Sequence, residues 1–234
     1  HQEARRQRQM CIRDRHYILQ SSLFNSCSKL RSRALAYTIA LLTIVTGATS
    51  ALSRSPNAFQ ALLASLDTRA HPLQVRYYEV GGLSVNEIRN ALDTQGPRDK
   101  LGNRGDALTL WRIKWRWPMD QHAKPIFSMT ESHLSVTLTL PRLTTYPQLT
   151  PQLQAQWDDF MYHLLLHEIG HLDIAADHYL EVGRAVRNAA KQIPNLNTEQ
   201  AHVIARNRLQ QIRRLDHDYD ELTKHGQTQG VIFR

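Results

Sequence analysis

The sequence has little cysteine. Cys11 and Cys27 are its two cysteines, and both precede the apolar stretch at 34–45. A disulfide framework and a thiolate metal site are therefore excluded from the rest of the chain. The apolar stretch is itself short for a membrane span and contains threonines. A metal site in the remaining residues has to use histidine and carboxylate ligands.

Positive charge is scarce outside the N-terminal segment. The formal net charge is +8, from 29 Lys and Arg against 21 Asp and Glu. Residues 1–33 contain eight of the basic residues and two of the acidic ones, which leaves 21 basic and 19 acidic residues for the remainder. Because this remainder is nearly neutral, it has no electrostatic footprint for nucleic acid, and we predict no nucleic-acid partner.

The first 73 residues have the composition of a leader and a linker. Residues 1–28 begin with His and contain MCIRDR, a string that resembles read-through adapter sequence, so we expect them to be non-native. Residues 29–51 have a basic start, the apolar stretch and small residues near Ser50, as in a secretory signal peptide. Cleavage there predicts a secreted or periplasmic protein without stable membrane insertion; retention predicts a membrane anchor. Residues 52–73 are interpreted as a linker with a short helical piece.

The next part of the chain alternates between strands and a short helix. Residues 74–80 are a strand candidate, and Ser84 with Glu87 forms a capping box that begins a helix at 85–92. Residues 109–117 alternate strictly, with Thr109 and the tryptophans on one face, which predicts a strand buried on one side. Residues 133–141 predict another alternating strand, ended by Pro141. HLSVTLTL, within this segment, is a candidate edge strand for binding an extended substrate.

Two long helices follow. Thr150 and Pro151 begin a helix expected to reach about Gln192, and a second is expected from about Thr198 to Lys224, before Gly226. The predicted fold is therefore α+β: a small sheet containing antiparallel strands, with a short helix, packed on the two long helices. Residues 74–234 form one predicted domain.

The first long helix contains the motif H-E-x-x-H. His167 and His171 are one turn apart on the same face, so their imidazoles can bind one Zn²⁺ ion. Glu168 is displaced by about 100° around the helix and can act on a water molecule as general base and then general acid. His163 and His178 lie too far along the helix for the same ion and are expected to line the cleft or the surface. Asp177 is expected to point away from the metal.

The third ligand is expected from the second long helix. If the two helices form an antiparallel hairpin that turns near residue 195, His171 faces about Tyr219 and His167 faces about Thr223. The segment 216–226, DHDYDELTKHG, is dense in ligand types. Its candidate ligands at this height are His225, Asp220, Asp218 and Asp216.

These motifs resemble a known family. YYEVGGLSVNEI, the W-x-I-x-W strand, HEIGH and YDELTKHG are similar to the bacterial predicted secreted Zn-dependent proteases, formerly a domain of unknown function, over about residues 74–232. The resemblance implies an exported metallopeptidase with a zincin-like fold. It favours His225 as the third zinc ligand, with Asp220 as the alternative. Tyr219 either donates its hydroxyl to the oxyanion, as a catalytic residue, or packs in the seam between the helices.

The sequence thus predicts an exported zinc peptidase that acts on a protein or peptide substrate. Two alternatives stay open. One is a cell-wall peptide amidase with the same zinc chemistry. The other is a non-catalytic envelope module that binds a metal or another ligand, and Glu168 argues against it because a structural zinc site needs no carboxylate at that position.

Overall fold

The computed structural model describes residues 57–66, 72–99 and 102–234. These residues belong to one compact unit that begins at Ser53. The predicted leader, 1–28, and signal peptide, 29–51, lie outside the described residues. Within the described residues, no helix is long and apolar enough to cross a membrane.

The fold is α+β, as predicted, with one three-stranded mixed sheet. Its strands are β1 (Leu73–Val80), β2 (Leu108–Arg116) and β3 (Glu131–Leu143). β3 is central: it pairs parallel with β1 and antiparallel with β2. Alternate residues of β2 and β3 are buried, so one face of the sheet packs against the helices and the other faces solvent.

The prediction that HLSVTLTL forms an edge strand is wrong, because these residues lie in the central strand. The edges of the described sheet are β1 and β2. Pro141 also does not end its strand, since β3 continues to Leu143. β2 pairs with β3 only as far as Thr139, so the missing N–H of Pro141 costs no hydrogen bond on that side.

Two of the described helices begin at the capping residues that the sequence predicts. α4 (Val85–Gln95) starts with the capping box of Ser84 and Glu87. α5 (Pro151–Gln192) starts at the N-cap Thr150, and α6 (Thr198–Thr223) starts at Asn197, whose side chain forms a capping box with Gln200. The remaining helices are α3 (Asn57–Leu66) and the 3₁₀ turns η1 (Phe127–Met129), η2 (Tyr146–Gln148) and η3 (Gln227–Gln229).

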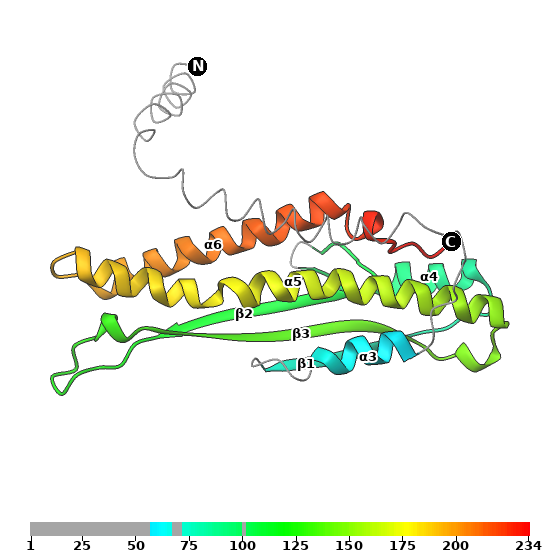
Figure 1. The fold of residues 1–234 in the computed structure, drawn as a ribbon, viewed down its shortest axis with the longest axis horizontal. Coiled ribbons are helices and arrows are strands. Elements are labelled where there is room, and N and C mark those ends of the chain that lie inside the picture. The colour runs from blue at the N-terminus through cyan, green and yellow to red at the C-terminus, as the bar shows by residue number, and fades with distance from the viewer. Residues whose placement is uncertain (1–56, 67–71, 100–101) are drawn as a thin grey trace, which may run out of the picture. The chain divides into compact units, whose positions relative to one another are not determined.

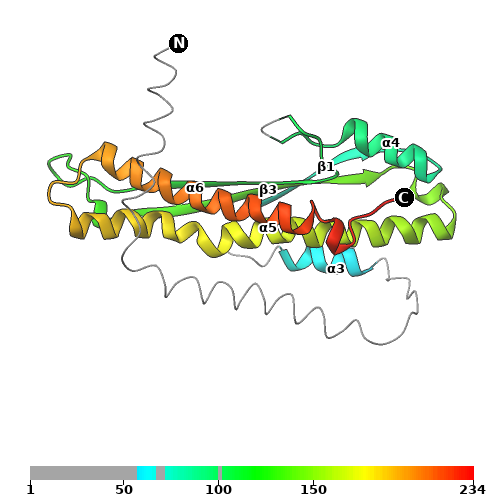
Figure 2. The same ribbon diagram turned by 90° about the horizontal axis from the view of Figure 1, so that it is seen from above.

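Helix α5 organises the core. α5 and α6 form an antiparallel pair that runs along the sheet, with α5 between α6 and the strands (Figure 1). Seen from above, α5 and α6 run side by side along the length of the strands (Figure 2). One apolar cluster joins α3, α4, β1 and the first half of α5, and a second joins β2, the second half of α5 and α6. The histidine motif lies where the two clusters meet.

The tryptophan side of β2 faces the helices, as the alternation predicts. Trp111 is buried, and Trp115 donates its indole N–H to Nδ1 of His202 on α6 at 3.1 Å. The rings of Trp117 and Phe127 meet edge-on, with centroids 4.9 Å apart. These contacts fix the position of β2 beside α6.

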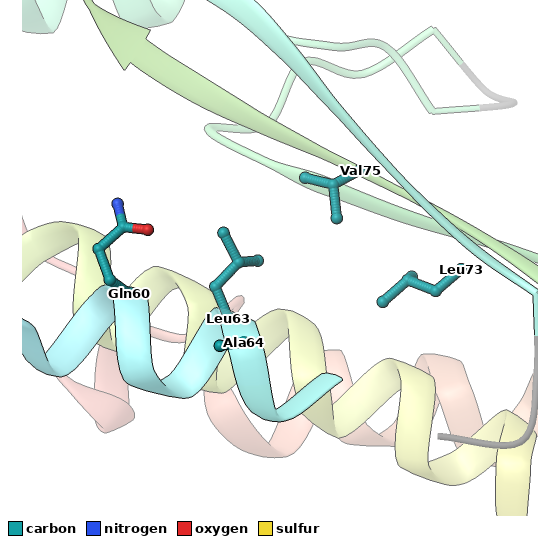
Figure 3. Close-up of a pocket in the computed structure, with 5 residues that line it drawn as sticks. All are labelled: Gln60, Leu63, Ala64, Leu73 and Val75. Atoms are coloured by element: carbon teal, nitrogen blue, oxygen red, sulfur yellow. The ribbon is translucent and has the colours of Figure 1, made fainter. Parts of the chain in front are cut away.

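The stretch interpreted as a linker, 52–73, contains α3, which packs on α5 and buries Leu66. A hollow of about 390 Å³ lies between α3 and β1 (Figure 3). Leu63, Leu73 and Val75 face one another across it. None of the residues that line this hollow belongs to the predicted site.

Candidate metal centre

The histidine motif is buried in the middle of α5. His167, Glu168 and His171 are 5 %, 5 % and 8 % exposed. Their neighbours Leu164, Leu165 and Leu172 are buried in the two apolar clusters, and this packing holds the helix rigidly. Buried polar side chains cost free energy unless they are paired, so the partners of these three residues define what the site can do.

The two imidazoles converge on one carboxylate from α6. His167 Nε2 lies 3.3 Å from His171 Nε2. Asp220 Oδ1 lies 3.3 Å from His167 Nε2 and 3.1 Å from His171 Nε2. Each residue offers one ligand atom, and these three atoms lie within 4.8 Å of one another. Asp220, the alternative third ligand from the sequence, is therefore the residue that completes the group.

The other nitrogen of each imidazole is held by a second partner. His171 Nδ1 donates to Asp216 Oδ1 at 2.8 Å, and His167 Nδ1 donates to Gln229 Oε1 at 2.9 Å. A carboxylate can only accept, so the Nδ1 of His171 carries the proton. Such partners fix the tautomer and the orientation of a ligating imidazole. Both Nε2 atoms are thereby directed towards the same point.

The charges of the group are strongly coupled. Burial lowers the pKa of His171, but hydrogen bonds with Asp216 and Asp220 outweigh burial and raise the pKa to about 10. Burial raises the pKa of Asp220, but hydrogen bonds with His167 and His171 outweigh it and hold that pKa well below its usual range. The centre therefore stabilises positive charge beside the Asp220 carboxylate.

Glu168 lies on the β2 side of α5. The hydroxyl of Thr109 donates to the Glu168 carbonyl oxygen at 3.1 Å, which ties β2 to the motif. Glu168 Oε2 is buried and has no hydrogen-bond partner among the described residues. Burial raises the pKa of Glu168, while the positive charge of His171 opposes the shift. A buried carboxylate oxygen without a partner calls for an explanation, and a water molecule between Glu168 and the histidines would provide one.

Tyr219 forms a wall of the site. Its ring stacks on His167, with centroids 5.2 Å apart and planes inclined by 14°, and meets His171 edge-on. Its hydroxyl donates to the carbonyl oxygen of His167 at 3.2 Å, and burial raises the pKa of Tyr219 to about 12. A Cβ on Gly170 would stand 2.2 Å from this hydroxyl. The close approach of Tyr219 thus depends on glycine at position 170.

His225 lies beside the group rather than in it. Its imidazole is 79 % exposed, and Nδ1 lies 3.5 Å from Asp220 Oδ1. α6 ends at Thr223, and Lys224, His225 and Gly226 all adopt positive φ angles. This turn leads the chain away from the helix before His225 reaches the histidine pair. Asp218 is exposed, and it is not part of the ligand group found among the described residues.

The predicted register between the two long helices is nearly correct. His171 contacts Tyr219, as predicted. His167 contacts Tyr219 and Asp220, one turn short of the predicted Thr223. The predicted pairing assumes straight, equally wound helices, and a small difference in their crossing is enough to shift the partner by one turn.

The other predicted residues lie outside the group. His163 is packed against the C-terminal segment, where a Cβ on Gly230 would stand 2.9 Å from its ring. His178 contacts Glu181 at 3.1 Å on the same helix, and Asp177 is exposed. These positions agree with the expectation that none of the three shares an ion with His167 and His171.

The group fits a metal ion. Two imidazole nitrogens and one carboxylate oxygen are ligand types that zinc uses in catalytic sites with three protein ligands. The convergent Nε2 atoms, the partners on both Nδ1 atoms and the unpaired Glu168 oxygen are all consistent with such an ion. The structure thus contains a group that could hold a metal.

Sequence reasoning missed two contributors to this site. Gln229 orients His167 from η3, and no local pattern marks it, since it comes from a turn beyond the end of α6. Gly170 occupies an unspecified position of H-E-x-x-H, and only the contact with Tyr219 explains why it is small. Asp216 is a candidate ligand in the sequence, but in the structure it accepts a hydrogen bond from Nδ1 of His171 instead.

Comparison with known proteins gives a family without an assigned activity. The family described as "Bacterial protein of unknown function (DUF922)" matches residues 75–226, which is more than half of the chain. The matched range contains β2, β3, α5, α6 and all of β1 but its first two residues, and it ends just before Gln229. No curated protein and no solved structure matches the chain.

Proposed function

This chain belongs to the bacterial family of unknown function DUF922, and we propose that it is a zinc-dependent peptidase. The observation that carries the proposal is the Glu168 oxygen, which is buried without a hydrogen-bond partner among the described residues. Glu168 directly follows His167, which belongs to the group of His167, His171 and Asp220. A purely structural metal site would gain nothing from this carboxylate, whereas a hydrolase needs a base there.

The ion would be held by His167, His171 and Asp220. When bound, zinc supplies an electrophile for the substrate carbonyl and lowers the pKa of water towards about 7. Asp216 and Gln229 would keep the two imidazoles aligned through their Nδ1 protons. His225 remains a predicted ligand, and its place beside Asp220 would let it approach the group if the turn after α6 rearranges.

Glu168 would move the proton. Burial raises its pKa, which makes the carboxylate a stronger proton acceptor than an exposed glutamate. Glu168 would accept a proton from water and then deliver it to the leaving amine. Tyr219 would hold the His167 ring by stacking. Its hydroxyl donates to the His167 carbonyl oxygen, so it would reach the oxyanion only after this hydrogen bond breaks.

The substrate would be a protein or peptide met outside the cytoplasm. This part of the proposal rests on the signal-peptide pattern at 29–51 and on the resemblance to predicted secreted proteases. A peptide is favoured over a small amide because β2 is an edge strand of the described sheet beside the site, and an extended peptide can add to such an edge.

Metal content is the first test. We expect elemental analysis of the purified protein to find one zinc ion per chain, and cleavage of a quenched-fluorescent peptide library to disappear with a chelator and return with zinc. His167→Ala should lose both zinc and activity. His178→Ala, on the same helix but outside the group, is the matched control and should keep both. The proposal is refuted if the folded protein takes up no zinc or cleaves peptides equally well without it.

A further inference from the structure

A second hollow lies beside the metal centre, between the free edge of β2 and helix α6. It has a volume of about 120 Å³. Leu110, Trp111, Arg112 and Ile113 line it from β2, and Leu209 and Arg213 line it from α6. We refer to it as the β2–α6 groove. Leu110 is 41 % exposed, so the groove offers apolar surface to a ligand as well as two arginines.

The groove adjoins the metal centre along both of its walls. On β2, Leu110 follows Thr109, which contacts Glu168. On α6, Arg213 lies three residues before Asp216, which corresponds to about 4.5 Å along the helix. Arg112 lies three residues after Thr109, about 10 Å along the strand. A ligand group in the groove would therefore sit about two or three residues of extended chain from the reacting bond.

The two arginines of the groove differ in pairing from other arginines on the same elements. Neither Arg112 nor Arg213 forms an ion pair or a side-chain hydrogen bond with a described residue. Arg116 on β2 and Arg208 on α6, by contrast, are paired with Glu131 and Glu181. Two unpaired guanidinium groups lining one small groove favour an anion between them.

We propose that the β2–α6 groove is a subsite for a carboxylate of the substrate. This inference rests on the proposed peptidase function and specifies its substrate: an extended peptide that adds to the edge of β2 and carries a carboxylate two or three residues from the bond to be cut. The carboxylate comes from an acidic side chain or from the C-terminus of the peptide. Arginine suits this role because its planar guanidinium group binds a carboxylate through two parallel hydrogen bonds.

The alternatives fit the groove less well. A nucleic-acid backbone needs a long basic track. Beyond Arg214, α6 becomes acidic towards the metal centre, at Asp216, Asp218 and Asp220. The same acidic residues would repel a carboxylate placed at the metal end, so they direct the anion to the arginine end. The charge pattern thus orients a substrate along the groove.

The test compares matched peptides. Starting from a peptide that the protein cleaves, Glu is replaced by Gln at each position within three residues of the cleaved bond, and a free C-terminus is replaced by an amide. We expect one of these replacements to lower kcat/KM by about tenfold, the size of a charge-assisted hydrogen bond that is partly open to water. The position that responds identifies the source of the carboxylate.

Variants connect the preference to the groove. Arg213→Gln and Arg112→Gln should each reduce the preference, and the double variant should cleave both members of the peptide pair equally. Arg213→Lys should retain part of it. Arg214→Gln removes the same charge from the neighbouring position of α6, does not line the groove, and should leave the preference intact. If Arg214→Gln has the same effect as Arg213→Gln, the general field of the surface explains the result and the subsite does not exist.

Binding separates this inference from the peptidase proposal. Extended peptides that differ only by Glu or Gln at one position, or by a free or amidated C-terminus, are chosen without regard to cleavage and labelled fluorescently. They are titrated into the Glu168→Gln protein and followed by anisotropy. A preference for the acidic peptide that disappears with Arg213→Gln supports the subsite even if no peptide is cleaved, in which case only the peptidase function fails. Cleavage or binding with no preference for a carboxylate at any position would overturn the subsite and leave the peptidase proposal standing.

Discussion

Replacement of Glu168 by Gln tests the central inference on activity and stability together. The change removes the charge of a buried side chain and keeps its size. The unpaired Oε2 atom costs about 1–3 kcal/mol of desolvation. Because the glutamine amide is still polar, we expect the variant to recover only the lower end of this range. The metal-free protein should become more stable by about 1 kcal/mol.

The same variant should lose activity without losing the metal. Glu168 is not in the ligand group of His167, His171 and Asp220, so zinc content should stay the same. Loss of a general base should lower kcat by about 10²–10⁴-fold. For a chain of this size, 1 kcal/mol corresponds to a rise in Tm of about 2–4 °C.

Three measurements decide the matter: elemental analysis, peptide cleavage and thermal unfolding followed by circular dichroism after metal removal. Glu79→Gln is the control, because Glu79 is an exposed residue of β1 whose ion pair within the described part of the chain is with Arg142, and surface pairs contribute little. Full activity with bound zinc would refute the role of Glu168 as base. If the variant has a lower Tm than the wild-type protein, the inference that the unpaired Oε2 atom destabilises the fold is refuted.

Three further predictions concern the surroundings of the site. Asp216→Ala removes the acceptor behind one ligand imidazole and should weaken zinc affinity about 10–100-fold in chelator competition; unchanged affinity would contradict the orienting role. Gly170→Ala places a Cβ 2.2 Å from the Tyr219 hydroxyl and should cost about 1–3 kcal/mol in urea unfolding, and a neutral effect would show that this contact gives way easily. Burial raises the pKa of Glu181, but Arg208 outweighs burial and lowers it, so its stabilisation is present above the unfolded pKa of about 4.3 and disappears as pH falls through the folded value. Glu181→Gln should therefore destabilise by about 1 kcal/mol at pH 7 and by less at pH 3, and an equal loss at both pH values would disagree with the ion pair.

Local patterns in the sequence determined the elements. The alternation of 109–117 and 133–141 predicts β2 and β3, and the cap at Thr150 marks the start of α5. The spacing of His167, Glu168 and His171 fixed their relative directions on one helix. These features depend on residues close together in the chain, so periodicity and capping chemistry are sufficient to find them.

Only the tertiary structure decided how the elements meet. The sequence could not choose among Asp216, Asp220 and His225, because the crossing of α5 and α6 and the left-handed turn after Thr223 determine which of them reaches the histidines. It also placed the wrong strand at the sheet edge, since alternation identifies a buried face but not a neighbour. Gln229 and the β2–α6 groove join segments far apart in sequence, and no local signal marks such a contact. The sequence thus supplied the reactive side chains on one helix, and long-range packing selected their partners and the surface open to a substrate.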